Sequence, residues 1–363
     1  MDRPLVALNR LLAVLLALPA VAPGLLPAAA RADVRTLSAG SHPITLPTEA
    51  PATFRLRRTA PGSTLHVALW YVGAGDSVGE GVRLTLGTTP DDTGCGSGAV
   101  FRPTLGEPAP LLTTSASTWT DEPDHPCGTA TEVFVTVGLP SDPADAGRAA
   151  TLVVREEPPL SAYAFDLLRE PAAPAWRPLD PDPAPQPVVA GATPENALLV
   201  EPGSLEVRLR PGRQAMVGIL LDWDQSLRAQ VDGSADAAVT IIGPMLGEDV
   251  ASSGPGWAQT HVASYLHRNS FDPTRAGASL DGPRYVLVGL PPGSAAATVT
   301  LTLAVDGSRG DGVPAYTVPT GADGPSADPP DDSAPAPIWI GAGALVVVVV
   351  IALTRRGARA RGR

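Results

Sequence analysis

The chain of 363 residues contains no lysine, only two cysteines and few aromatic residues. All 26 of its basic residues are therefore arginines. The scarcity of cysteine excludes a small scaffold that depends on many disulfides. The sequence also lacks an amphipathic helical pattern of useful length, which argues against a helical bundle. With abundant Ala, Pro and Gly, the absence of lysine is typical of a GC-rich bacterial genome such as that of an actinobacterium.

The N-terminal segment has the three parts of a bacterial export signal. Arg3 and Arg10 form a positive region, Leu11–Leu18 is an apolar core, and Ala30–Ala32 offers a cleavage site with small residues. The apolar core is too short to span a membrane. We therefore expect a signal peptide over residues 1–32, with a retained signal anchor as the alternative.

The C-terminal segment is the longest uncharged apolar stretch in the chain. Ile338–Leu353 includes five consecutive valines and is followed directly by five arginines. Such a run is near the lower limit for crossing a bilayer as a helix, and a basic cluster beside it stays in the cytoplasm. We expect a transmembrane helix over residues 337–354 and a basic cytoplasmic tail over 355–363. With the export signal, this predicts a single-pass type I protein of the cell membrane with most of the chain outside.

The charge distribution agrees with this division. The whole chain carries −11, of which the signal segment contributes +2 and the tail +5, so the exterior carries −18. An acidic exterior argues against nucleic acid as a partner. It is compatible with bound cations, with basic partners or simply with solubility.

The two cysteines, Cys95 and Cys127, both lie in the predicted exterior. In an oxidising compartment a pair of cysteines favours one structural disulfide. The alternatives are a metal pair or a catalytic thiol, for which His125 is the only nearby histidine. We expect the disulfide.

Alternation of apolar and polar residues predicts β-strands throughout the exterior. The clearest runs are 54–56, 65–71, 82–86, 133–137, 151–155, 205–209, 215–221, 239–242, 285–288 and 298–305. Proline-rich segments divide them, because proline removes backbone donors and breaks regular structure. We expect an all-β fold with β-sandwich domains over 36–157 and 196–318. A proline-rich linker over 158–195 joins them, and a disordered acidic stalk over 319–336 leads to the membrane.

The two predicted domains share landmarks. Pro61-Gly62 precedes an apolar strand, and Pro211-Gly212 does the same 150 residues later. The tetrapeptide Val-Gly-Leu-Pro starts at Val137 and again at Val288, 151 residues later. Two landmarks at nearly one offset predict a tandem repeat.

This order of elements resembles the prepeptidase C-terminal domain and related jelly-roll modules of secreted bacterial proteins. The matching residues are Pro61-Gly62 with Leu65–Tyr71, Pro211-Gly212 with Met216–Asp224, Phe134–Val137 and Tyr285–Val288. The resemblance implies non-catalytic companions of peptidases. This chain departs from that arrangement because no peptidase domain accompanies the two modules and a membrane anchor does. The architecture also resembles actinobacterial surface proteins with tandem domains of this kind.

A hydrolase site would need a histidine beside a serine and a carboxylate. The sharpest local combination is His261, Ser264 and His267, with Asp222 or Asp224 brought near by folding. A histidine in a loop of a β-sandwich is more often simply solvated. We therefore expect no enzyme, with a membrane-tethered hydrolase as the alternative.

Acidic residues give weak candidates for a metal site. Hard oxygen ligands suit Ca²⁺, yet neither cluster has the spacing or the ligand number of a complete calcium loop. Solvated turn residues are the simpler interpretation, so we expect no cofactor, with Ca²⁺ as the alternative. The candidates are Asp121, Glu122 and Asp124 in one loop and Asp222 and Asp224 in another.

Aromatic residues in long loops are candidates for ligand binding. Trp119, Trp257 and Tyr265 lie in such loops, where a core role is less automatic and a ring can stack on a sugar or a peptide. The simpler interpretation is that these rings cover the edge of a sandwich. We expect a surface protein that presents two modules to an unknown protein or glycan, or an accessory subunit of an envelope complex. A purely structural spacer is the third possibility.

Overall fold

The computed structural model describes residues 34–74, 79–102, 110–122, 124–270, 272–310 and 312–317. Of these, 45% lie in strands and 8% in helices, so the predicted all-β class is confirmed. The predicted signal peptide, stalk, transmembrane helix and tail lie outside the described residues. Within the described ranges, no helix has the length and apolar character needed to cross a membrane.

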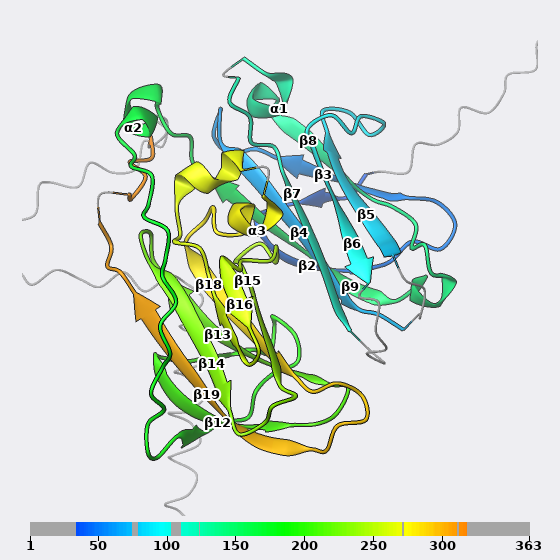
Figure 1. Cartoon of the computed structure of the whole chain (residues 1–363). Helices are drawn as coiled ribbons and strands as arrows, with labels where there is room; N and C mark the ends of the chain where they lie inside the picture. Colours follow the sequence, from blue (N-terminus) through cyan, green and yellow to red (C-terminus); the bar gives the residue numbers. More distant parts are fainter. Residues whose placement is uncertain are drawn as a thin grey trace, which may run out of the picture. The chain divides into compact units, whose positions relative to one another are not determined.

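The first half of the chain forms two sheets around one core (Figure 1). One sheet has the strand order β1-β3-β8-β5-β6 and the other the order β2-β9-β4-β7. We call them the first sheet pair. Their bounds are Thr36–Leu37 (β1), Gly40–Thr45 (β2), Ala52–Arg57 (β3), Thr64–Val72 (β4), Gly79–Gly87 (β5), Gly96–Arg102 (β6), Leu111–Ser117 (β7), Glu132–Val137 (β8) and Ala149–Glu157 (β9).

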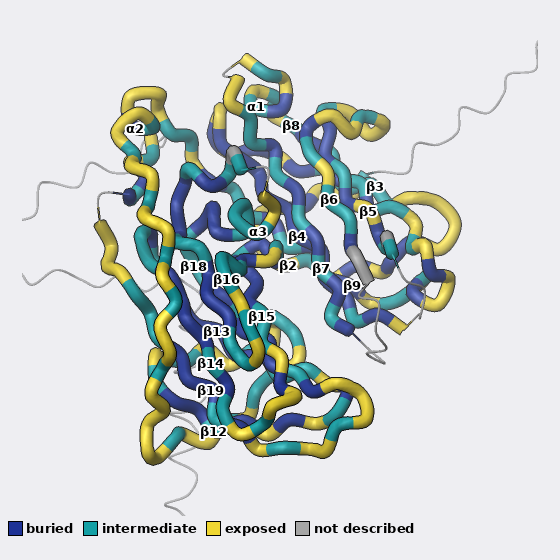
Figure 2. The backbone as a smooth tube through the Cα atoms, viewed as in Figure 1, coloured by how far each residue is buried: buried dark blue, intermediate teal, exposed yellow. Residues whose placement is uncertain are grey.

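Strand β4 shows why this pair needs a partner. Its alternate residues from Leu65 to Tyr71 enter the first core, as the period of two requires. Its other face, which includes Ala68 and Trp70, belongs to a different apolar cluster. Nearly the whole strand is therefore buried, as Figure 2 shows.

The second half forms another two sheets around a second core. The strand orders are β10-β12-β19-β14-β17-β16 and β11-β13-β18-β15. We call them the second sheet pair. Their bounds are Gln186–Pro187 (β10), Leu198–Leu199 (β11), Gly203–Leu209 (β12), Gln214–Leu221 (β13), Ser226–Asp232 (β14), Ala238–Ile242 (β15), Ser252–Gly254 (β16), Trp257–Gln259 (β17), Gly282–Gly289 (β18) and Ala297–Asp306 (β19).

The two sheet pairs share a strand order. The run β1-β3-β8-β5 corresponds to β11-β13-β18-β15, and β2-β9-β4-β7 corresponds to β12-β19-β14-β17. Even the parallel pairing of a two-residue edge strand recurs, in β1 with β3 and in β11 with β13. Strand β10 and strand β16 extend the second pair beyond this shared set.

The shared order tests the two sequence landmarks separately. The Val-Gly-Leu-Pro tetrapeptides begin at the ends of β8 and β18, which occupy equivalent places. The Pro61-Gly62 turn joins β3 to β4, whereas Pro211-Gly212 joins β12 to β13, so these two turns are not equivalent. The Pro-Gly offset of 150 residues is therefore not a mark of the repeat, and that part of the prediction was wrong. Both turns contain a glycine with positive φ, which is common between strands, so the dipeptide recurs without equivalence.

The predicted disulfide between Cys95 and Cys127 is present, with the two Cα atoms 5.2 Å apart. Cys95 lies just before β6 and Cys127 lies in the short helix α1 (Pro126–Thr129). His125 caps this helix, its Nδ1 accepting a hydrogen bond from the backbone N–H of Cys127. The bridge therefore ties a loop of the first sheet pair to the segment that enters β8.

The segment predicted as a linker runs along the second sheet pair and contacts it. Helix α2 (Ala162–Asp166) places Phe165 edge-on to Tyr265, with ring centroids 6.1 Å apart. Further on, the ring of Trp176 stacks on that of Trp257 at 4.1 Å. The segment then supplies β10, which pairs with β12. Its prolines permit this extended path, because they favour extended backbone.

A third apolar cluster joins the two sheet pairs, and both belong to one compact unit that ends at Val318. Trp70 of β4 meets Met216 of β13 and Leu287 of β18 in this cluster. Ionic contacts surround it, including that of Arg155 with Asp281. We call this region the junction.

Candidate functional site

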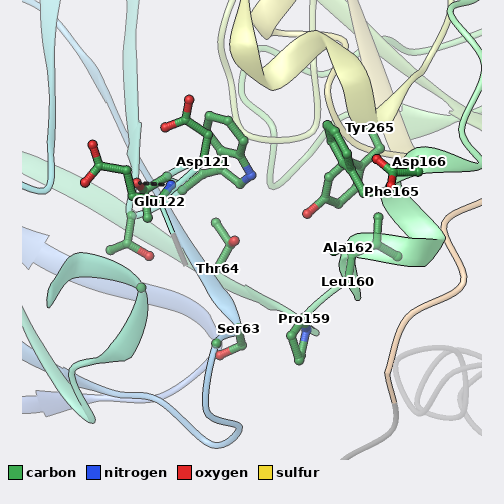
Figure 3. Close-up of a pocket in the computed structure, with 15 residues that line it drawn as sticks. Ser63, Thr64, Asp121, Glu122, Pro159, Leu160, Ala162, Phe165, Asp166 and Tyr265 are labelled. Atoms are coloured by element: carbon green, nitrogen blue, oxygen red, sulfur yellow. Dashed lines mark hydrogen bonds between the residues drawn. The ribbon is translucent and has the colours of Figure 1, made fainter. Parts of the chain in front are cut away.

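A pocket of about 430 Å³ opens beside the junction (Figure 3). This volume lies within the range of ligand sites, which is roughly 300–1,000 Å³. Its walls come from the start of β4, the loop after β7, the segment around α2 and the 3₁₀ helix η2 (Tyr265–Asn269). The lining residues are Gly62, Ser63, Thr64, Thr118, Trp119, Thr120, Asp121, Glu122, Gly128, Pro159, Leu160, Ala162, Phe165, Asp166 and Tyr265.

The loop after β7 is fixed by hydrogen bonds at Thr118. Its backbone N–H donates to the carbonyl of Leu65, and its hydroxyl oxygen accepts from the N–H of Leu65 at 3.0 Å. The buried guanidinium of Arg58 donates to the same hydroxyl at 3.1 Å. Arg58 also donates to carbonyls in and beside α1, at Cys127 and Gly128. These bonds hold Trp119 and the acidic residues that follow it at the rim of the pocket.

Tyr265 forms the opposite wall and is held by a buried ionic group. The guanidinium of Arg268 lies over its ring, 3.3 Å from the centroid. Arg268 also donates two hydrogen bonds to Glu157, at 2.6 and 2.9 Å. Glu157 further accepts from His66 and from the hydroxyl of Tyr316. Tyr265 therefore stands on a rigid support built from both halves of the chain.

The groups of this support favour the charged form of Glu157. Burial acts to raise the pKa of Glu157, but the hydrogen bond from His66 and the charge of Arg268 outweigh it and lower the pKa to about 2. Burial raises the pKa of the Tyr265 phenol, against the opposing influence of the charge of Arg268.

The rim of the pocket is acidic. Asp121 and Glu122 lie on one side and Asp166 on the other, as Figure 3 shows. All three are exposed, and within the described part of the chain none has an ion-pair partner. The described lining includes no lysine, arginine or histidine. The pocket thus combines carboxylates with the rings of Trp119, Phe165 and Tyr265.

The three aromatic candidates separate in the structure. Trp119 and Tyr265 lie together in the pocket. Trp257 is not in its lining, and one face of its indole is covered by Trp176. Gly254 lies so close to Trp257 that an added Cβ would stand 2.4 Å from its Nε1. Trp257 is therefore packed as part of β17 and the segment that covers it.

The acidic metal candidates are either exposed or engaged in contacts with neighbouring residues. Asp121, Glu122 and Asp124 are exposed in the loop before α1. Asp222 faces Arg309 at 3.6 Å, and Asp224 accepts from the N–H of Gly312 at 2.8 Å. Among the described residues, no three histidine, cysteine or acidic side chains gather as a metal site would require.

The histidine region does not assemble a triad among the described residues. The hydroxyl of Ser264 accepts from the N–H of Leu266 as the cap of η2, and no hydrogen bond joins it to His261 or His267. Asp249, which sequence reasoning missed, is a carboxylate in direct contact with this region. It accepts from the backbone N–H of His261 and pairs with Arg284 at 2.8 Å, both side chains being fully buried.

Sequence reasoning also missed most of the pocket. Ser63, Thr64 and Pro159 carry no motif, and Asp166 is one of many acidic residues in a proline-rich stretch. A signal was available at Phe165, which is an apolar ring in a segment that has no core of its own. The pocket depends on contacts between distant parts of the chain, which a local pattern does not reveal.

Comparison with known proteins adds little. No family model matches the sequence, and no curated protein matches it. Solved structures give weak similarities to the CUB1-EGF-CUB2 region of human MASP-1/3, to an atomic structure of Sulfolobus turreted icosahedral virus and to dimeric latent PorU from Porphyromonas gingivalis. Their identities are 9%, 11% and 11%, with TM-scores of 0.17, 0.19 and 0.20. The matches cover 73%, 73% and 74% of this chain and 99%, 59% and 22% of the three others. Scores this low carry no argument about fold or function.

Proposed function

We propose that this chain is a non-enzymatic surface protein anchored in the cell membrane, single-pass and of type I. Its exterior presents two tandem β-sandwich modules that resemble prepeptidase C-terminal domains and arose by duplication. The modules bind a ligand or protein outside the cell, or serve an envelope complex as its accessory subunit. The observation that carries the binding role is the pocket, where Trp119 and Tyr265 lie together beneath an acidic rim.

The support for duplication is the shared strand order of the two sheet pairs. The support for binding at the pocket is its composition. Fixed aromatic rings beside unpaired carboxylates give both contact area and polar selectivity, which is the usual build of a ligand site. The membrane topology rests on the sequence of the two chain ends.

A photo-crosslinker placed in cells tests the binding role. The full-length protein carries a photoreactive amino acid in place of Ala162, an exposed residue of the pocket lining, or of Leu220, an exposed residue of β13 outside that lining. We expect a defined adduct from position 162 and none from 220. Adding Trp119→Ala should remove most of the adduct while the protein stays folded. Equal labelling at both positions, or labelling indifferent to Trp119, contradicts a ligand at this pocket.

Protease treatment of intact cells tests the topology. We expect the exterior to be digested from outside while the basic tail stays protected until the membrane is opened. An exterior that resists digestion in intact cells and is cut only after lysis would overturn the type I arrangement. A tail epitope gives the readout, and a cytoplasmic marker protein serves as the control.

A further inference from the structure

We propose that the pocket recognises a basic side chain of a peptide, an arginine or lysine whose charged end meets the acidic rim. This inference rests on the proposed binding function and adds the class of ligand. It is carried by three features of the pocket: its unbalanced charge, the acceptor oxygen of Ser63 and its aromatic walls.

The charge around the pocket is unbalanced. Asp121, Glu122 and Asp166 stand at the rim without ion-pair partners among the described residues. Of the two arginines that contact the lining, Arg268 is paired with Glu157, and Arg58 donates to backbone carbonyls and keeps its charge. These two cations are outnumbered by the described carboxylates around the pocket, which are Asp121, Glu122, Asp166 and Glu157. A cationic ligand would therefore meet a net negative charge.

A further carboxylate lies behind the wall. Glu156 accepts hydrogen bonds from the hydroxyl of Ser63, from both the N–H and the hydroxyl of Thr59, and from the N–H of Ala60. All of these donors are neutral. Burial acts to raise the pKa of Glu156, but the hydrogen bonds outweigh it and lower the pKa. Its negative charge lies near Arg58, where it opposes the lowering of the guanidinium pKa by burial, and it thus offsets that cation beside the pocket.

One hydroxyl of the lining is turned into an acceptor. Ser63 gives its proton to Glu156, which leaves its oxygen lone pairs free. The hydroxyls of Thr118 and Thr120 instead accept from protein N–H groups, so their own protons remain available to donate. The oxygen of Ser63 is therefore suited to a ligand with N–H donors, and ammonium and guanidinium groups carry only donors.

The aromatic walls suit the stem of a basic side chain. Trp119, Phe165 and Tyr265 offer ring faces and edges beside Leu160 and Pro159. The methylene stem of Arg or Lys packs on such surface while its charged end stays near water and carboxylates. Trp is also the strongest cation–π partner. The structure already uses this chemistry, in the stacking of Arg268 on Tyr265.

A matched pair of peptides tests the inference. The probes are a short fluorescent peptide with one arginine between glycines and the same peptide with citrulline, which keeps the shape and removes the charge. Affinities are measured by fluorescence anisotropy with the full-length protein in detergent at low salt. We expect the arginine peptide to bind about tenfold more tightly, the size of one or two exposed ion pairs with a cation–π contact.

Variants locate the effect. Replacing all three rim carboxylates, by Asp121→Asn, Glu122→Gln and Asp166→Asn, should remove most of the preference for arginine. Higher salt should weaken the preference of the wild-type protein. The control is Glu49→Gln, which removes an exposed carboxylate outside the pocket lining and should leave both affinities unchanged. Circular dichroism confirms that the variants are folded.

The outcomes separate this inference from the binding function. If both peptides bind equally and Trp119→Ala abolishes binding, the pocket is a ligand site but not one for basic groups, and the inference fails alone. If neither peptide binds, the inference also fails, whatever the crosslinking experiment shows. A preference for arginine that survives loss of the rim carboxylates would place recognition elsewhere and overturn it too.

Discussion

The two sheet pairs share one strand order but stabilise their loops by different chemistry. The first pair has the Cys95–Cys127 disulfide, which ties the loop before β6 to α1. The second pair contains no cysteine, and its loops surround the ion pair of Asp249 and Arg284, neither of which is exposed. The two pairs thus keep one strand order, while a disulfide stabilises loops of the first pair and a buried ion pair stabilises those of the second.

The largest expected effect comes from breaking the ion pair of the second sheet pair. Arg284→Met leaves Asp249 buried without its counter-charge. Removing one member of a buried pair destabilises a protein by about 3–5 kcal/mol, because the remaining charge stays desolvated. Chemical denaturation of the full-length protein in detergent measures the loss.

The control is the double variant Arg284→Met with Asp249→Leu. A well-packed apolar pair can replace a buried ion pair at little cost. We expect the double variant to recover most of the stability that Arg284→Met loses. If it is as unstable as the single variant, Asp249 has a role beyond its pairing with Arg284, such as its bond from the N–H of His261.

The next effect comes from the first sheet pair. Replacing both cysteines by alanine opens a loop with a sequence separation of 32, for which chain entropy predicts a loss of about 3 kcal/mol. The loss should appear in the denaturation midpoint and should be matched by reducing the wild-type protein. A variant that is as stable as the oxidised wild type would show that the loop is held by other contacts, such as those of Arg58.

The smallest effect is a difference in pH dependence between the second sheet pair and the junction. Burial lowers the pKa of His267 to about 4, with help from the charges of His261 and Arg284. The pKa of a histidine in the unfolded chain is about 6.5. The contribution of neutral His267 to the free energy of unfolding is therefore complete above about pH 6.5 and is lost as the pH falls towards 4. Glu157, with its pKa of about 2, contributes fully above about pH 4.5 and loses its contribution below that value.

His267→Gln isolates the share of His267 in the upper window, to which His66, whose pKa burial also lowers, contributes in both proteins. Stability of the wild type should fall by about 1.4 kcal/mol per pH unit between pH 6 and 4.5 on account of His267, and the variant should be flatter there. Below pH 4.5 both proteins should lose stability alike through Glu157. An unchanged slope in the variant between pH 6 and 4.5 would mean that another group titrates in that window.

The sequence was sufficient for strands with a strong alternation. The runs at 65–71, 133–137 and 298–305 all lie within strands of the structure. Weakly apolar strands escaped notice, for local reasons. Strand β2 contains a proline, β6 contains two glycines, and β14 contains Arg228, which is 8% exposed and paired with Asp306. A buried arginine interrupts the apolar pattern because its counter-charge comes from a different strand.

The candidate site was accessible to sequence reasoning only in part. Trp119, Tyr265, Asp121 and Glu122 stood out as residue types in long loops, but nothing local indicated that they share one pocket. Tyr265 reaches Trp119 only because the two halves of the chain pack together at the junction. Trp257 looked equivalent to Trp119 in sequence, and the ring that covers it comes from the proline-rich segment. Long-range packing decides which of these aromatic residues line the pocket.

The last described residues determine how the protein would respond to mechanical load. The N–H of Thr317 donates to the carbonyl of Pro159, and Tyr316 pairs with Leu160 and donates to Glu157. Tension drawn through the C-terminal side would thus reach the junction and the wall of the pocket before either sheet pair. These few hydrogen bonds would break one after another, whereas the strands of a sheet resist shear together. The pocket would therefore open first under tension, while the cores of both sheet pairs remain intact.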